Sequence, residues 1–455
     1  MTSTTSRTVV VGGGMAGVRL VDRLAALGAA DGVTVIGEEP HAPYNRLLLD
    51  GVLAGRYAPE VVELPRPDGP AYLSGVRAVR IDRDDAAVVC DNGDRVPYDT
   101  LVLATGSSAV LPPLRGLSGT AGPGSPRLPE GVRTFRTMDD CLALAPRARP
   151  GVRAVVVGGG LLGVCAARAL ASRGVRVVLA QRGGHLMDRH LDPRAAALLR
   201  AHLESLGVEV RTGCRVRGLL VRGSGEGRAV EGVETADGSR TEADLVVPAC
   251  GVRPRTGLAA AAGLTVRRGI VVDDGLRTDD PRIHAIGDCA EHRGTVHGLA
   301  GPARDQADLL ARRLAAPGGA GGTGRVPLYR GSRVLTRLTL TGPRTGTGPA
   351  TSPSAAGDGT TAVGDGTTTA GEGTGDVFDL AAFGEVAAGP EDHELLLSDA
   401  TRGAYRKVVL RDGRLVGGIL LGDLAAVGTL ARTWEGGEPL PGHPIHLLTT
   451  DGGHR

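Results

Sequence analysis

An α/β fold built on parallel strands is predicted by this sequence, because one local pattern occurs twice along its 455 residues. In residues 7–39, and again in residues 153–181, a Val-rich strand runs through a glycine turn into a helix and then a second strand. Apolar side chains recur at helical spacing in the first helix, and Gly28 and Gly174 stand where the two helices should end. Strand, crossover helix and parallel strand form a βαβ unit, so we expect two such units in one chain.

The C-terminal third of the chain has a different pattern. From about residue 325 short strand-like segments follow one another, and the last two form a hairpin around Asp412 and Gly413. Residues 325–440 therefore predict a small α+β C-terminal domain. A Gly/Thr/Ala-rich stretch interrupts it at about residues 343–375, and we expect this insert to be disordered, because it has too few apolar side chains to offset the entropy of ordering.

Charge and hydropathy exclude several classes of function. The 52 basic and 50 acidic residues nearly cancel, so no overall field would attract nucleic acid or an anionic membrane. No apolar run approaches the roughly 20 residues that span a bilayer. The N-terminus runs directly into a strand without a signal-peptide core. We therefore expect a cytoplasmic protein whose partners are small molecules or other proteins.

The six cysteines are scattered along the chain, and none forms a CxxC or CxxxxC pair. Spacings of this kind are typical of zinc sites, iron-sulfur clusters and active-site dithiols. We therefore expect no metal site, and most of the thiols should act as small buried hydrophobic groups.

The first glycine turn has the spacing of a dinucleotide-binding fingerprint. Gly12 allows a tight turn, Gly14 lets the backbone approach a pyrophosphate, and Gly17 lets the helix and strand pack closely. Met15 and Ala16 begin the helix, whose N-terminal end would attract the pyrophosphate. These five residues are the first candidate cofactor-binding group.

The second glycine turn repeats the fingerprint at Gly158, Gly160 and Gly163. One such motif is a weak signal, whereas two in one chain, each between a strand and a helix, are far more specific. We therefore expect one chain to bind two dinucleotides.

The two units differ at the end of their second strands. Glu38 stands there in the first unit, where a carboxylate can accept hydrogen bonds from both hydroxyls of an adenosine ribose; the alternative is an exposed loop acid. The second unit offers Gln181 and Arg182 instead. A neutral side chain followed by an arginine favours a ribose 2′-phosphate, and so NADPH, although Arg182 could equally point into water.

At this point the sequence resembles the glutathione-reductase-like flavoprotein reductases, which have two dinucleotide-binding domains. More closely, it looks like the flavoprotein part of the assimilatory NAD(P)H nitrite reductase large subunit and of related nitrate-assimilation electron-transfer subunits. The similarity covers most of residues 7–315 and reaches into the C-terminal domain. The stretches that carry it include "VVVGGGMAGVRLVDRL", "PYNRLLLDGVLAG", "YDTLVLATGSSAVLPPLRG", "DLVVPACGVRPRTGL", "IHAIGDCAEHRGTVHGLAGPARDQADLLARRL" and "KVVLRDGRLVGGILLGD".

The resemblance implies which residues meet FAD. Glu38 would hold the adenosine ribose, Arg46 would reach the pyrophosphate or flavin, and the backbone near Ala78 would contact adenine. A helix beginning near Pro302 would direct its positive end at the flavin and stabilise the anionic reduced ring. The remaining implied cofactor contacts are Thr105, Gly106, Gly251, Asp288 at the ribityl chain, and the backbone of Ala303.

Three residues near these contacts have more than one interpretation. Gln306 is a less certain contact. His297 is either a flavin neighbour or an ordinary hydrogen-bonded histidine, and the second is the more usual role. Cys289 beside Asp288 suggests redox chemistry, but a lone cysteine more often serves packing.

One departure from related reductases bears on the branch of the family. Many ferredoxin and rubredoxin reductases read "PYxRxxLSK", with a lysine near the flavin, whereas this sequence has Asp50 and Gly51 at the end of that stretch. The nitrite-reductase branch also lacks the lysine, so the departure favours that branch. The cysteine-rich and siroheme-bearing regions of the full nitrite reductase are expected to be missing from this chain, which should not reduce nitrite by itself.

The resemblance implies an FAD-binding domain of residues 1–115 and 245–318, with an NAD(P)-binding domain of residues 116–244 inserted in it. The expected function is hydride transfer from NAD(P)H to flavin and delivery of the electrons to a separate iron-sulfur or heme protein, in nitrite or nitrate assimilation. No catalytic side chain is required, because flavin N5 accepts the hydride. A ferredoxin- or rubredoxin-type reductase and a slowly turning-over flavin sensor are alternatives. A disulfide reductase is disfavoured by the lack of paired cysteines, and a homodimer is compatible with the resemblance.

Overall fold

The computed structural model describes residues 6–117, 128–224, 227–316, 327–341, 377–399 and 403–436. Its contacts divide the chain into two compact units. The first unit consists of Met1–Leu49, Val62–Ala109 and Val252–Val334, and the second of Asp50–Val61, Val110–Gly251 and Leu335–Arg455. In the described part of the chain, no helix has both the length and the apolar character needed to cross a membrane.

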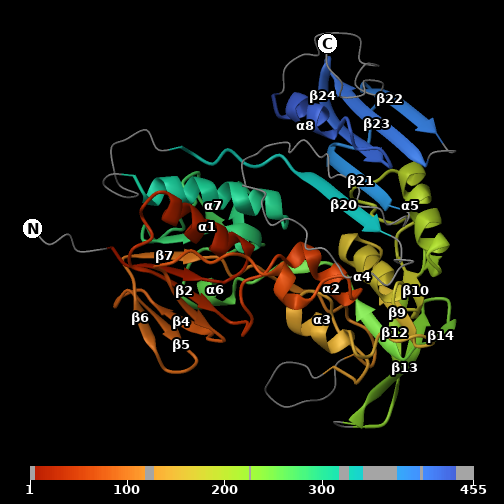
Figure 1. Cartoon of the computed structure of the whole chain (residues 1–455), viewed down its shortest axis with the longest axis horizontal. Coiled ribbons are helices and arrows are strands. Elements are labelled where there is room, and N and C mark those ends of the chain that lie inside the picture. Colours follow the sequence, from red (N-terminus) through yellow and green to blue (C-terminus); the bar gives the residue numbers. More distant parts are fainter. Residues whose placement is uncertain are drawn as a thin grey trace, which may run out of the picture. The chain divides into compact units, whose positions relative to one another are not determined.

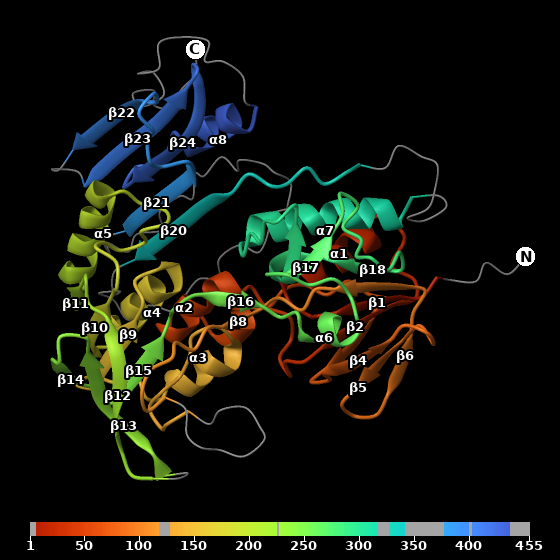
Figure 2. The same cartoon turned by 180° about the vertical axis from the view of Figure 1, so that it is seen from behind.

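A five-stranded parallel sheet forms the centre of the first unit, in the order β18-β7-β1-β2-β3 (Figures 1 and 2). Its strands are β1 Thr8–Val11, β2 Val33–Gly37, β3 Ala71–Ser74, β7 Thr100–Leu103 and β18 Ile283–Ala285. Three further strands of this unit form an antiparallel sheet: β4 Ala78–Asp82, β5 Ala87–Cys90 and β6 Arg95–Pro97. The strand order places the first glycine turn, after β1, at the carboxyl edge of the central sheet.

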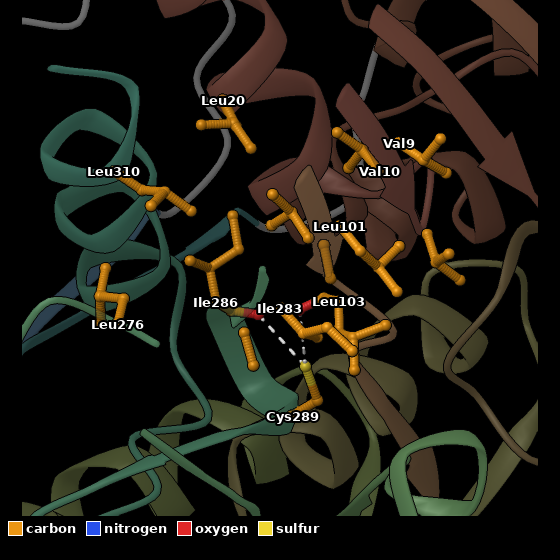
Figure 3. Close-up of a cluster of buried hydrophobic side chains, with 14 of the residues drawn as sticks. Val9, Val10, Leu20, Leu101, Leu103, Leu276, Ile283, Ile286, Cys289 and Leu310 are labelled. Atoms are coloured by element: carbon orange, nitrogen blue, oxygen red, sulfur yellow. Dashed lines mark hydrogen bonds between the residues drawn. The ribbon is translucent and has the colours of Figure 1, made fainter. Parts of the chain in front are cut away.

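Two helices of the first unit, α1 Met15–Ala26 and α7 Ala300–Leu314, pack against each other although they lie far apart in the sequence. Arg19 of α1 donates from Nε to Asp308 of α7 at 2.7 Å. Their apolar faces and the central strands share one core, which Figure 3 shows in close-up. The buried side chains labelled there include Val9 and Val10 of β1, Leu101 and Leu103 of β7, Ile283 of β18, Leu20 of α1 and Leu310 of α7.

The remaining elements of the first unit connect these layers. They are η1 Arg46–Leu48, β8 Ser107–Ala109, β16 Val252–Pro254, α6 Gly257–Ala261, β17 Ile270–Val272, η4 Gly287–Cys289 and β19 Ala290–His292. Strand β8 pairs with β16, so the chain leaves and re-enters this unit at neighbouring strands. The chain also passes into the second unit after Leu49 and returns at Val62. Two short helices lie at these points, α2 Leu49–Leu53 and η2 Pro59–Val62.

The second unit repeats the parallel architecture with four strands, in the order β11-β10-β9-β15. These strands are β9 Arg153–Val157, β10 Arg176–Ala180, β11 Val208–Arg211 and β15 Leu245–Pro248. Helices α4 Leu161–Ala171 and α5 Pro193–Ser205 connect three of them, and α3 Met138–Leu144 precedes them. An antiparallel sheet completes this half with β12 Val216–Arg222, β13 Ala229–Thr235 and β14 Arg240–Glu242.

The C-terminal part of the second unit is a five-stranded antiparallel sheet, in the order β20-β21-β24-β23-β22. The strands are β20 Leu335–Thr341, β21 Val377–Gly384, β22 His393–Asp399, β23 Ala404–Arg411 and β24 Arg414–Leu421. Helix α8, Val427–Gly436, packs on β24, and the ring centre of its Trp434 lies 5.3 Å from that of Phe383 on β21. The predicted hairpin around Asp412 and Gly413 is the β23–β24 connection.

A charged cluster joins this antiparallel sheet to helix α5. Asp192 caps α5 by accepting from the amide of Ala195 at 2.9 Å. It also accepts from the hydroxyl of Tyr405 at 2.6 Å and from Nζ of Lys407 at 3.1 Å, both on β23. Lys407, the only lysine of the sequence, is buried and reaches Glu394 at 2.7 Å as well.

The predicted fold class is confirmed: one parallel α/β fold is inserted in another and an antiparallel C-terminal domain follows. The predicted domain boundaries agree less closely with the contacts. Strand β15 begins at Leu245 yet pairs with β9, so residues 245–248 belong to the second sheet and not to the first domain. Helix α7 begins at Ala300, two residues before the expected Pro302. The insert expected at residues 343–375 lies outside the described residues, and the strands before and after it, β20 and β21, pair directly.

Candidate dinucleotide-binding sites

The first glycine turn can be made only from glycine at two of its positions. Gly12 has φ of +123°, and a Cβ there would collide with the carbonyl oxygen of Ala104. A Cβ at Gly17 would collide in turn with the carbonyl oxygen of Gly12. Gly14 is different, because a Cβ there would meet nothing within 4 Å. The sequence therefore brings strand, turn and helix into contact and leaves open space in front of Gly14.

That open space faces the N-terminus of α1. Gly14 is the N-cap residue, Met15 and Ala16 begin the helix, and no side chain caps it. Uncapped amides at a helix N-terminus attract a phosphate through hydrogen bonding and the helix dipole. Gly287 also approaches here, since a Cβ on it would lie 3.0 Å from that of Ala16. The turn before Asp288 thus lies against the first turn of α1.

Glu38 follows β2 and forms an ion pair with Arg255, whose Nη1 lies 2.6 Å from Oε2 of Glu38. The Arg255 backbone also holds the segment after β7: its N–H donates to Gly106 O at 2.9 Å, and its carbonyl accepts from Thr105 at 2.7 Å. Glu38 and Arg255 are about half exposed, and exposed ion pairs contribute little to stability. Glu38 can therefore exchange Arg255 for ribose hydroxyls at small cost. The sequence reasoning missed Arg255, although it lies inside the quoted stretch "GVRPRTGL".

The "PYNR" segment holds Arg46 in one orientation. The Arg46 Nη2 donates to Glu39 Oε1 at 2.9 Å, and its guanidinium lies 5.3 Å from the ring centre of Tyr44. Tyr44 itself donates to Glu39 Oε2 at 2.6 Å. Asn45 accepts from the amide of Leu47 and so starts the short helix η1. These contacts limit the rotamers of Arg46 and hold its positive charge in one place.

Ala78, the expected adenine contact, begins strand β4 opposite Cys90.

Asp288 lies in η4, directly after the buried strand β18. Its Oδ2 accepts from the hydroxyl of Ser107 at 2.7 Å. Gln306 of α7 is buried and accepts from the amide of Gly287 at 2.7 Å, so it positions the turn that carries Asp288. This gives Gln306 a positioning role that the sequence left open.

Cys289, next to Asp288, points into the core. Its thiol donates to the carbonyl oxygens of Leu103 at 3.3 Å and Ile286 at 3.2 Å, contacts drawn in Figure 3. Burial raises the pKa of this thiol, which disfavours the reactive thiolate. Cys289 therefore serves packing, the more usual of its two interpretations.

The N-terminal turn of α7 has no side-chain cap. Ala303 is buried in it, and its amide donates to Leu299 O at a long 3.4 Å. His297 lies just before the helix, and burial together with the nearby His292 lowers its pKa. Because His297 is then neutral, the positive charge at this end of α7 comes from the helix dipole alone.

The second glycine turn has the geometry of the first. Gly158 has φ of +113°, and a Cβ there would lie 2.5 Å from the carbonyl oxygen of Ala249. A Cβ at Gly163 would collide with the carbonyl oxygen of Gly158. Gly160 is the N-cap residue of α4, where no side chain caps the helix and a Cβ would meet nothing within 4 Å. Each unit therefore has one open helix N-terminus behind a glycine turn.

The side chain of Gln181, just after β10, binds the backbone of this turn. Its Oε1 accepts from the amide of Gly159 at 2.9 Å, and its Nε2 donates to Asp188 at 3.2 Å and to the carbonyl of His185 at 3.3 Å. Arg182 is exposed and has no hydrogen bond or ion pair with the described residues. Of the two residues, Arg182 is the one available to a ligand. Gly251 was also expected near a cofactor. Its carbonyl oxygen accepts from the amide of Val110 at 2.9 Å and so joins the two chain segments that follow β8 and precede β16.

The structure gives a physical reason for the missing lysine of the "PYNRLLLDG" stretch. A Cβ at Gly51 would lie 2.5 Å from the ring of Tyr57, so no larger side chain fits there. Asp50 forms an ion pair with the buried Arg168 of α4. This part of the chain is therefore built to anchor α2 on α4.

The comparisons with known proteins agree with this geometry. Residues 6–307 match the pyridine nucleotide-disulphide oxidoreductase family. The chain belongs to this family. Pyridine nucleotide-disulphide oxidoreductases of this type bind FAD and use NAD(P)H, the two dinucleotides that the family resemblance implied. Residues 376–435 match the C-terminal domain of rubredoxin NAD+ reductase.

Two relatives come from Bacillus subtilis (strain 168). An NAD(P)H nitrite reductase is 33% identical over 424 residues, which are 91% of this chain and 45% of that protein. An assimilatory nitrate reductase electron transfer subunit is 33% identical over 425 residues, 92% of this chain and 48% of that protein. The chain thus spans about half the length of these curated relatives. The reductase in the crystal structure of the covalent putidaredoxin reductase-putidaredoxin complex shares the fold, with a TM-score of 0.76 at 24% identity over 97% of this chain and 95% of that one.

None of the six cysteines is in a disulfide, and Cys250 is the only one that is exposed. Among the described residues, no group of three or more His, Cys, Asp or Glu side chains could hold a metal ion.

Proposed function

We propose that this chain takes hydride from NAD(P)H onto FAD and passes the electrons to a separate redox protein of the iron-sulfur or heme type. The observation that carries the proposal is the pair of open helix N-termini behind glycine turns, one in each unit. One site suits the pyrophosphate of FAD and the other that of NAD(P)H. Partner reduction is favoured over disulfide reduction because the chain lacks paired cysteines.

FAD, when bound, accepts a hydride and can release its two electrons singly. The side chains described above supply binding and electrostatics and no proton. We assign the ribose of FAD to Glu38, its pyrophosphate to α1 and Arg46, and its ribityl chain to Asp288. The N-terminus of α7 would stabilise negative charge on the reduced ring through its dipole. The donor pyrophosphate is assigned to the amides of Gly160 and the first turn of α4.

The names of two relatives support a proposal for the physiological setting. A nitrite reductase and a nitrate reductase electron transfer subunit favour a role in nitrite or nitrate assimilation. The putidaredoxin reductase fold is the precedent for a small redox-protein acceptor. A cytoplasmic location, expected from the sequence, is part of the same proposal.

Stopped-flow absorption of the FAD-loaded chain tests the proposal. NAD(P)H is expected to bleach the flavin band within seconds, and the reduced protein should reduce ferricyanide but form no ammonium from nitrite. Bleaching over many minutes would support the flavin sensor instead. Ammonium formation by this chain alone would contradict the need for a partner.

The donor preference provides a second test, and we expect NADPH to be favoured through Arg182. A guanidinium on a ribose 2′-phosphate, discounted for solvent, contributes about 1 to 2 kcal/mol, or roughly 5- to 30-fold in kcat/KM. Arg182→Ala should therefore lower kcat/KM for NADPH by that factor and leave the value for NADH unchanged. A parent that prefers NADH, with a donor ratio that Arg182→Ala does not move, would contradict the assignment.

The structure shows why Gln181→Glu is the poorer variant for this test. A glutamate could still accept from Gly159 but would lose the donor bonds to His185 and add a carboxylate beside Asp188. The donor ratio would then change through a distorted turn as well as through the ribose contact. Arg182→Lys is the better control, since it keeps the charge and removes the planar guanidinium fork.

A further inference from the structure

A pocket of about 610 Å³ lies in the first unit, outside the glycine turns. Its walls are the loop between β17 and β18, the turn after β19 and the C-terminal end of α7. The volume falls within the range of small-molecule binding sites. None of the residues assigned to FAD or NAD(P)H lines it, so the pocket has no role in the proposed function.

Arginine dominates the charge of this pocket. Arg267, Arg277, Arg293 and Arg313 line it together with two carboxylates, Asp273 and Asp274, which leaves a net charge of +2 from four cations and two anions.

Both carboxylates already have partners. Asp274 accepts from Arg293 at 2.6 Å and from His292 at 2.8 Å. Asp273 Oδ1 accepts from two backbone amides, those of Gly275 at 2.7 Å and Arg277 at 2.9 Å. The carboxylates therefore shape the loop, and the excess positive charge of the four arginines remains.

Arg313 is the central observation. Its side chain is only 5% exposed, and its Nη1 donates to the carbonyl of Pro327 at 3.2 Å. Its Nε has no hydrogen-bond partner, and burial and the charge of Arg277 lower its pKa more than the charge of Asp273 raises it. A buried guanidinium that no carboxylate binds directly is costly to folding unless a ligand supplies the charge.

The positive charge of the pocket also affects a buried histidine, His284. His284 of β18 is 1% exposed, and its Nδ1 has no hydrogen-bond partner. Burial first, and then the charges of Arg277 and Arg313, lower its pKa to about 4, against the opposing effects of a backbone hydrogen bond at Leu276 and of Asp273. An anion in the pocket would offset these positive charges.

We propose that this pocket binds a phosphate group, with Arg313 and Arg277 as its principal ligands and Arg267 at the rim. Guanidinium groups bind phosphate oxygens with charge-assisted, often bidentate hydrogen bonds, and a phosphate dianion matches the net charge of the pocket. The group could arrive as inorganic phosphate or on a small phosphorylated metabolite.

Isothermal titration calorimetry of the FAD-loaded full chain with inorganic phosphate tests this, with potassium chloride at matched ionic strength as the reference. We expect saturable binding of one phosphate at this pocket, weakened about tenfold or more by Arg313→Met and by Arg277→Met. Arg80→Met, on exposed β4 of the same unit, is the matched control and should not change the affinity. Glycerol 3-phosphate in place of phosphate distinguishes the sources, since tighter binding points to a metabolite and weaker binding to the free ion.

Nuclear magnetic resonance of the His284 ring provides a readout that does not depend on heat, with His284→Gln assigning the signal. Phosphate is expected to raise the pKa of His284 in the parent protein and in Arg80→Met, and not in Arg313→Met. Absence of saturable phosphate binding, or binding that survives both arginine substitutions in folded protein, would overturn the proposal.

Discussion

Replacing Gly158 with alanine is expected to impair reduction of the flavin by NAD(P)H severely while FAD remains bound. The added Cβ would lie 2.5 Å from the carbonyl oxygen of Ala249, at a φ of +113° that side chains rarely adopt. Relief of this contact must move the turn away from the N-terminus of α4. If backbone strain of about 1 to 3 kcal/mol must be overcome for the donor to bind, kcat/KM should fall by about 5- to 150-fold for either donor.

Gly160→Ala is the matched control for this substitution. It lies in the same turn, but a Cβ there meets nothing within 4 Å, so the thermal midpoint should stay near that of the parent. A fall in the kcat/KM of Gly160→Ala would then mean that the added methyl group hinders binding of the donor's pyrophosphate. Dithionite should still bleach the flavin of Gly158→Ala, since FAD is assigned to the other unit. Parental kcat/KM for NAD(P)H in Gly158→Ala would contradict the assignment of the second turn.

Replacing Lys407 with methionine is expected to lower the free energy of unfolding of the second unit by about 3 kcal/mol. Lys407 is buried, and its loss leaves Asp192 and Glu394 without their shared cation. Chemical denaturation followed by far-ultraviolet circular dichroism measures the change. Lys407→Arg should retain much of the stability, and Arg414→Met, exposed on β24, should change it by less than about 0.5 kcal/mol.

The effect of Lys407→Met should also depend on pH. Burial alone would raise the pKa of Asp192, but hydrogen bonds from Ala195, Tyr405 and Lys407 hold it below its ordinary value of 3.8. The stabilisation from ionised Asp192 is therefore fully present well above pH 3.8 and is lost as the pH falls through the lower folded-state pKa. The difference between parent and variant should shrink below about pH 4. An equal difference at pH 3 and pH 7 would show that Lys407 acts by packing alone.

The backbone of the candidate site could be predicted in part, because the glycine turns depend on local geometry. The spacing of Gly12, Gly14 and Gly17 predicted a turn, an open helix end and a close helix–strand contact, and the structure has all three. The same holds for the second turn. Arg255 was not predictable, because its partner Glu38 lies far away in the sequence and only folding brings them together. The use of Gln181 inside its turn was missed for a similar reason, since its partners come from a loop that folds back over the glycines.

The sequence by itself determined the fold class, the two glycine turns and the C-terminal hairpin, because periodicity and glycine spacing act over a few residues. Only the tertiary structure decided which sheet takes β15, which thiols are buried and which side chains remain for a ligand. It also showed that Arg313 and His284, separated in the sequence, lie close enough for the charge of one to act on the other. These features depend on long-range packing. They depend also on whether residues distant in the sequence offset the cost of burying a polar or charged side chain, which no local sequence pattern shows.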